Sequence, residues 1–152
     1  MTSASDYRKI KSLNKKAPEW KWIETNFGIE PSEDIPLAAH LRKDISERIG
    51  EALDSMENII GGGESYSGFF ERKMLNEKEK QEIFEIYKRM QGLLWEGRKA
   101  SITGSDKDLA AWLASVKTLW DGTRPKLVKF FDKISEGWMN YKKPETETQY
   151  HG

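Results

Sequence analysis

The chain has 152 residues and carries 25 basic and 25 acidic side chains, so its formal net charge is zero. It contains no cysteine, which excludes disulfides, cysteine-ligated zinc and thiol catalysis. The neutral charge also argues against a domain that neutralises nucleic acid with its whole surface, because such domains are usually strongly basic.

The first residues contain no apolar run of the kind found in secretory signals, and no stretch approaches the roughly 18 apolar residues of a membrane span. We therefore expect a cytoplasmic protein. Domains most often have about 100–150 residues, so a single domain is expected, covering residues 1–143. The remainder, 144–152, is polar and begins with proline, which predicts a flexible tail.

Residues 1–35 form a basic and aromatic segment. It contains the short basic stretch "YRKIKSLNKK", followed by "APEWKWIETNFG", which predicts a helical segment that ends at Gly28. We expect the apolar residues of this segment to pack on the rest of the domain, namely Trp20, Trp22, Ile23 and Phe27.

Four longer segments have apolar residues spaced by threes and fours, which is typical of amphipathic helices. They cover residues 37–60, 77–99, 106–120 and 125–142. Pro36 and Gly61 bound the first, and Asn76 with Glu79 resembles a capping box at the start of the second. The apolar stripe of the second is expected to comprise Ile83, Tyr87, Met90 and Leu94.

The last two segments are expected to be separate helices. Ser105 is the predicted N-cap of the third helix, and "DGT" is read as the link to the fourth, with Thr123 or Arg124 at the cap. Short links favour antiparallel neighbours. The predicted fold is an all-α up-down bundle of four main helices with an additional N-terminal helical segment.

The stretch "NIIGGGESYSGFFERK" resembles a phosphate-binding loop only in its glycines. No strand precedes them and no Lys-Ser/Thr pair follows, so a helix end is the better interpretation. The connection 61–76 is long for a bundle. Its aromatics either cover the core, with "GFFERKML" as a short helix, or bind a partner: Tyr66, Phe69 and Phe70.

Few residues of the chain fit a known catalytic or metal-binding pattern. The chain has two histidines, His40 and His151, and neither follows a glutamate at the spacing that di-iron bundles use. A helical projection places His40 on the polar side of its helix, so we expect a solvated residue. We assign no catalytic residue, metal ligand or cofactor, and expect a protein that is not an enzyme.

One face of the 37–60 helix is acidic. A solvated helix face is the ordinary explanation of such a pattern. The alternatives are a docking face for a basic partner and a weak surface for divalent ions, which would allow an ion-dependent enzyme. This acidic ridge consists of His40, Asp44, Glu47, Glu51, Asp54 and Glu57.

Basic residues gather near both ends of the chain. They are either solvated, with pairing to the acidic ridge of a neighbouring copy as one option, or form one nucleic-acid contact surface beside Trp20 and Trp22. The candidates are Arg8, Lys9, Lys11, Lys15, Lys16, Lys126, Lys129 and Lys133.

Some apolar residues fall outside the main helical stripes. Phe84 and Trp95 share a second face of the 77–99 helix, and Val128 and Met139 share one on the 125–142 helix. Such faces are sandwiched between neighbours or bind a partner. The leading hypothesis is a non-enzymatic interaction protein whose partner is another protein or itself, and the alternative is nucleic-acid binding.

Overall fold

The computed structural model describes residues 3–29, 35–61 and 65–142, and in these ranges it contains α-helices and no strand. This confirms the all-α fold class. None of these helices is both long and apolar enough to cross a membrane. The helices are α1 (Ser3–Lys11), α2 (Trp20–Phe27), α3 (Leu37–Ile60), α4 (Tyr66–Lys73), α5 (Glu77–Thr103) and α6 (Asp106–Met139).

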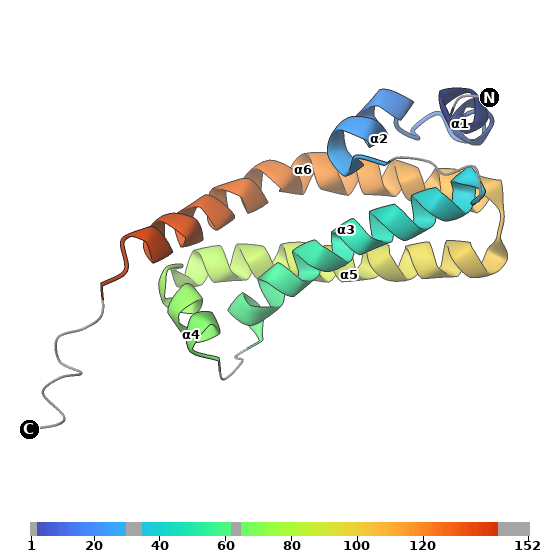
Figure 1. Cartoon of the computed structure of the whole chain (residues 1–152). Coiled ribbons are helices and arrows are strands. Elements are labelled where there is room, and N and C mark those ends of the chain that lie inside the picture. Colours follow the sequence, from blue (N-terminus) through green and yellow to red (C-terminus); the bar gives the residue numbers. More distant parts are fainter. Residues whose placement is uncertain (1–2, 30–34, 62–64, 143–152) are drawn as a thin grey trace, which may run out of the picture.

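Three long helices form the body of the molecule, and α5 packs against both α3 and α6. Figure 1 shows α3 and α6 running in the direction opposite to α5. Helices α1 and α2 lie over α6 and the start of α3, while α4 lies at the other end, beside the end of α3. The arrangement is therefore an up-down bundle with short helices at both ends.

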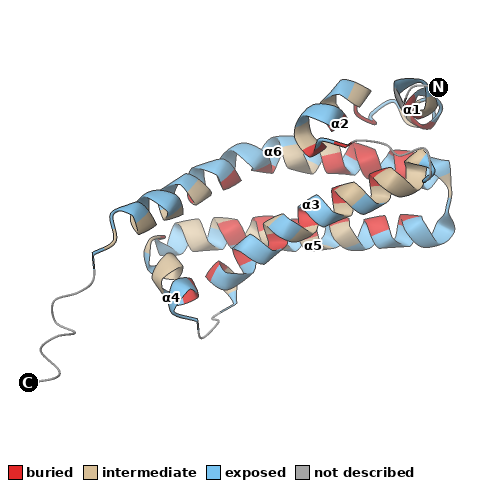
Figure 2. Ribbon diagram, viewed as in Figure 1, coloured by how far each residue is buried: buried red, intermediate tan, exposed pale blue. Residues whose placement is uncertain are grey.

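A single cluster of buried side chains runs through the bundle, with members from α1, α2, α3, α5 and α6 (Figure 2). The predicted apolar face of α3 is confirmed, since its main residues are buried: Leu41, Ile45, Ile49, Leu53, Met56 and Ile59. On α5, Ile83 and Met90 are buried as expected, but so are Ile86 and Leu93. The buried face of α5 is wider than predicted because two long helices cover it.

The predicted break between residues 120 and 125 is wrong, because α6 is continuous and contains Pro125. A proline inside a helix costs about 3 kcal/mol and removes one backbone hydrogen bond. Burial of Thr123 and Leu127 on the two sides of Pro125 favours a continuous helix despite that loss. Thr123 is not a cap; its hydroxyl donates a hydrogen bond to the carbonyl of Leu119 at 2.8 Å. Helix α6 bends near its middle instead of ending there (Figure 1).

Two other boundaries differ from the prediction. Helix α5 extends beyond residue 99 to Thr103. The turn between α5 and α6 therefore consists of two residues, Gly104, which has a left-handed conformation with a φ of 64°, and Ser105, which is the N-cap of α6. Helix α6 ends at Met139 rather than at residue 142. The segment "GFFERKML" does form a short helix, α4, which starts at Tyr66.

The N-terminal segment packs on the bundle as predicted. Helix α2 ends at Gly28, which has a φ of 58°, and the Phe27 ring lies 5.0 Å from that of Trp120. Helix α1 was not predicted as a separate helix. Tyr7 anchors it, because its buried hydroxyl donates a hydrogen bond to the carbonyl of Pro18 at 2.6 Å. Burial and the nearby charge of Glu19 raise the pKa of Tyr7. The predicted tail, 144–152, lies outside the described residues.

The capping box at the start of α5 also ties this helix to α6. Asn76 accepts a hydrogen bond from the backbone N–H of Glu79 at 2.8 Å, and its own N–H donates to the Glu79 carboxylate at 3.0 Å. The ammonium of Lys133 on α6 donates to the same carboxylate at 2.6 Å. The bonds from Lys133 and Asn76 lower the pKa of Glu79.

We expect Glu79→Gln to lower the free energy of unfolding at neutral pH by about 1 kcal/mol, through the weakened cap and the lost ion pair. The folded-state pKa of Glu79 lies below its ordinary value of 4.5. The stabilisation by the ionised Glu79 carboxylate is therefore fully present above the ordinary pKa and disappears as the pH falls through the lowered, folded-state pKa. Urea denaturation across the acid range should show a shallower loss of stability in the variant.

Glu77→Gln is the matched control, because Glu77 lies in the same turn but pairs only with Lys80 within its own helix. It should leave the acid dependence close to that of the unaltered protein. Identical pH profiles for the two variants would contradict the role assigned to Glu79.

Candidate functional site

The side of α5 that faces away from α3 and α6 carries large apolar side chains. Phe84, Trp95 and Ile102 are 39%, 61% and 88% exposed. They are spaced by eleven and seven residues, which at about 100° per residue places them on one line along the helix. Figure 2 shows exposed residues along α5, interrupted by buried and intermediate ones. Water-exposed aromatic rings in a row are uncommon on a monomeric protein and typically mark a binding surface.

Two cations lie over these rings. The guanidinium of Arg98 is 4.4 Å from the centre of the Trp95 ring, and the ammonium of Lys88 is 5.5 Å from that of Phe84. Both distances fall within the range of cation–π attraction. The two cations lie on the same side of α5 as the apolar residues because their spacing continues the helical repeat. We call this set the outer α5 stripe: Phe84, Lys88, Trp95, Arg98 and Ile102.

The acidic ridge of α3 is exposed along most of its length, and within the described residues the side chains of Glu47, Glu51, Asp54 and Glu57 make no ion pair. His40 differs from the prediction. Its side chain is only 13% exposed, and its Nδ1 lies 3.0 Å from the carboxylate of Asp44. Both α1 and α2 contact α3. No group of three potential metal ligands occurs in the described part of the chain.

The aromatics of the 61–76 connection gather against the end of α6. Phe70 contacts Trp138 and Tyr141, with ring centres 4.3 Å and 4.6 Å away, and Tyr66 shares a hydrogen bond with Tyr141. Phe69 points outward, with the Lys73 ammonium 4.3 Å from its ring. Phe70 therefore takes part in packing, whereas Tyr66 and Phe69 remain half-exposed.

The basic residues from the two ends of the chain are largely separated by the fold. Lys11 pairs with Glu19, at 3.4 Å, on the side of α1 and α2. Lys133 pairs with Glu79 near the start of α5, toward the opposite end of the bundle. Trp22 is partly buried, and its indole N–H donates to the carboxylate of Asp121 at 2.9 Å.

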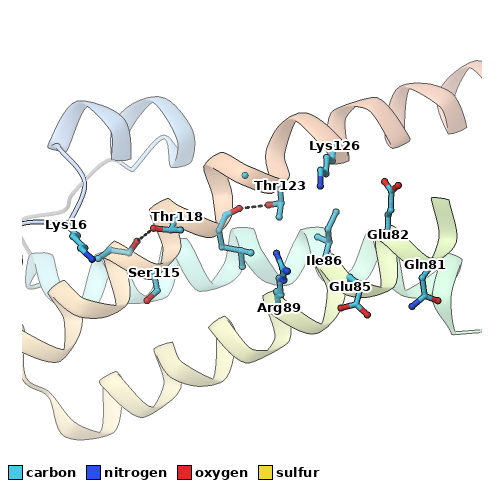
Figure 3. A pocket seen from close by; sticks show the side chains of 13 residues that line it. Lys16, Gln81, Glu82, Glu85, Ile86, Arg89, Ser115, Thr118, Thr123 and Lys126 are labelled. Carbon is cyan, nitrogen blue, oxygen red and sulfur yellow. Dashed lines mark hydrogen bonds between the residues drawn. The ribbon is translucent and has the colours of Figure 1, made fainter. Parts of the chain in front are cut away.

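Two members of the basic set nevertheless line one groove. Lys16 and Lys126 line the same groove, which lies between α5 and α6 and has a volume of about 620 Å³. Arg89 of α5 also lines it. Figure 3 shows Arg89 pointing from α5 toward α6, Lys126 pointing back toward α5, and Lys16 at one end. We call this the α5–α6 groove. The remaining basic candidates, Arg8, Lys9, Lys15 and Lys129, do not line it.

Comparison of the chain with protein-family models, with curated proteins and with solved structures finds no match in any of the three. The geometry of the described residues is therefore the basis of any functional assignment.

Sequence reasoning identified Phe84 and Trp95 but missed two features. Ile102 follows Phe84 by eighteen residues, which is five helical turns, and extending the helix beyond residue 99 would have revealed it. The groove has no signal in the sequence pattern, because Lys16, Arg89 and Lys126 come from three separate segments.

Proposed function

We propose that this protein is a helical interaction module that binds an acidic amphipathic helix of a partner protein along the outer α5 stripe. The observation that carries the proposal is the line of exposed Phe84, Trp95 and Ile102 with Lys88 and Arg98 over its rings. The stripe spans about 27 Å at about 1.5 Å per residue, the length of five helical turns. That length suits recognition of one helix by another.

The apolar residues favour a helical partner. An amphipathic helix presents apolar side chains at every third or fourth residue, which matches the repeat of the stripe. Exposed tryptophan is the residue type that most often dominates binding energy at interfaces. Burial of Trp95 between the two helices would remove its ring from water and strengthen its contact with the Arg98 guanidinium, because cation–π attraction increases on desolvation.

The charges favour an acidic partner over a second copy. The Arg98 guanidinium lies over the Trp95 ring and makes no ion pair among the described residues, so its N–H groups are available to a carboxylate. Lys88 pairs with Glu85 within its own helix, at 3.3 Å, and that exposed contact is weak. Two copies joined through this stripe would bring like charges together, which disfavours self-association.

The test uses a designed helix of about three heptads with leucine at its contact positions and glutamate beside them. We expect binding by fluorescence anisotropy, and Trp95→Ala should weaken it at least about 30-fold, the loss typical of a central tryptophan. The same peptide with lysine in place of glutamate should bind far more weakly. Equal binding of the acidic and basic peptides would contradict the proposed charge recognition.

Phe69→Ala is the matched control variant. Phe69 is also a half-exposed ring with a lysine over it, but it lies on α4. Its removal should leave peptide affinity unchanged. If Phe69→Ala weakens binding and Trp95→Ala does not, the partner surface is the α4 aromatics. Sedimentation should show a monomer, and a dimer abolished by Trp95→Ala would favour a second copy as the occupant.

A further inference from the structure

The α5–α6 groove lies beside the outer α5 stripe and shares no residue with it, although Glu85 of the groove pairs with Lys88 of the stripe. Its volume of about 620 Å³ falls within the range of about 300–1,000 Å³ that is usual for small-molecule sites. The groove is open where α6 presents small residues to α5, among them Ala114, Ser115 and Gly122. The bend of α6 near Pro125 lies at the same level of the bundle.

The charges that face this groove are mostly positive. Arg89 and Lys126 point into it from opposite walls and Lys16 lies at one end (Figure 3). Within the described part of the chain none of these three side chains makes an ion pair. Glu82 points toward α6, whereas Glu85 points away from the gap in Figure 3 and pairs with Lys88. Three cations and two carboxylates therefore line the groove, and because Glu85 is paired with Lys88 the remaining balance attracts an anion.

The hydroxyl groups of the groove are not free to donate hydrogen bonds to an anion, so the cations are the groups that would recognise it. The hydroxyls of Ser115, Thr118 and Thr123 donate their hydrogen bonds to backbone carbonyls one turn earlier in α6, at 3.3, 3.1 and 2.8 Å. A hydroxyl that has already donated its proton can only accept, so it does not favour a negatively charged atom. Ile86 and Leu119 supply apolar wall beside the cations.

We infer that the α5–α6 groove binds a small amphipathic organic anion. Its phosphate or carboxylate group lies between Arg89 and Lys126, and its apolar body lies along Ile86 and Leu119. Charge-assisted hydrogen bonds from the guanidinium and the ammonium hold the anionic group, and removal of the apolar body from water adds affinity. The binding mode is typical of small-molecule sites, in which a few polar groups orient a ligand on a mostly apolar wall.

The test is a titration of the ¹⁵N-labelled full chain with 1-naphthyl phosphate at low salt, followed by NMR. We expect amide shifts confined to the segments around Arg89, Thr118 and Lys126. Arg89→Met and Lys126→Met keep an apolar stem and remove the charge, so each should weaken binding about tenfold, as expected for loss of one charge-assisted hydrogen bond. Glu82→Gln should tighten binding, because it removes the carboxylate that points toward α6 and makes no ion pair among the described residues.

Arg98→Met is the control, since it removes the same kind of charge from the outer side of α5. Arg98→Met should leave the binding of naphthyl phosphate unchanged and weaken the binding of the acidic peptide. Arg89→Met should weaken the binding of naphthyl phosphate and leave the binding of the acidic peptide unchanged. The two proposals can therefore fail separately.

Three results would overturn the inference. The first is no shift change at ligand concentrations above about 1 mM, where even weak specific sites fill. The second is equal binding of the uncharged 1-naphthalenemethanol, which would show an apolar groove without anion recognition. The third is tighter binding of a single-stranded oligonucleotide that depends on Arg8 and Lys9, which would identify the basic residues as a nucleic-acid surface.

Discussion

Trp112→Ala is expected to lower the free energy of unfolding by about 3–5 kcal/mol, the usual loss when a buried tryptophan is truncated. The Trp112 ring is buried between α5 and α6, and its indole N–H donates a hydrogen bond to the carbonyl of Leu93 at 2.8 Å. The substitution leaves a cavity at the contact between the two helices. Urea or thermal denaturation followed by circular dichroism measures the change, which is large compared with the marginal stability of a single domain.

The same contact makes a sharper comparison possible on α5. A Cβ atom at Gly97 would lie 2.6 Å from Cζ2 of Trp112, so alanine there forces the ring or the helix to move. At Gly92 on the same helix an added Cβ would have no neighbour within 4 Å beyond the adjacent residues and the local helix backbone. Gly97→Ala should therefore destabilise the protein, whereas Gly92→Ala should stabilise it by roughly 0.5–1 kcal/mol through helix propensity. Stabilisation by both substitutions would contradict the described position of Trp112.

Pro125→Ala should raise the free energy of unfolding by about 2–2.5 kcal/mol. Pro125 has no N–H to donate to the carbonyl of Asp121, and its ring crowds that carbonyl, a combination that costs about 3 kcal/mol inside a helix. Alanine restores a donor, and the exposed proline ring loses no buried contact. The greater freedom of the unfolded chain offsets roughly 0.4–1 kcal/mol of the gain.

Arg124→Ala serves as the control for Pro125→Ala, because Arg124 is exposed and adjacent but donates a normal backbone N–H. In the Pro125→Ala variant the new amide should also exchange slowly with solvent, which would report the restored hydrogen bond. Equal or lower stability would show that packing beyond the bend, such as that of Leu127 and Phe130, requires the bent helix.

The helices that could be predicted from the sequence were those whose signals are local. Both bounds of α3 agree with the prediction, since Pro36 and Gly61 mark its ends and its apolar residues repeat at threes and fours. The capping box of Asn76 and Glu79 fixed the start of α5, and Ser105 fixed the start of α6. At the starts of α5 and α6 a neighbouring side chain accepts a hydrogen bond from the helix backbone, whereas α3 has no side-chain cap and is bounded by Pro36 and Gly61. In each case a short window of sequence suffices.

The continuity of α6 could not be predicted in this way. "DGTRP" is locally a helix breaker, yet burial of Thr123 and Leu127 against other helices outweighs the local preference. The expected exposure of His40 was wrong for a related reason, because a helical projection places a residue on a polar face but does not show how far the rest of the fold buries it.

The candidate sites also differ in how much of each could be predicted from the sequence. Phe84 and Trp95 could be found by the sequence alone, because both lie on one helix and a fixed repeat relates them. That they stay exposed could be decided only by the tertiary structure, which shows which sides of α5 are covered by α3 and α6. The groove of Lys16, Arg89 and Lys126 depends on tertiary structure entirely. Helical periodicity is a property of neighbouring residues, whereas exposure and the meeting of distant charges depend on how whole helices pack.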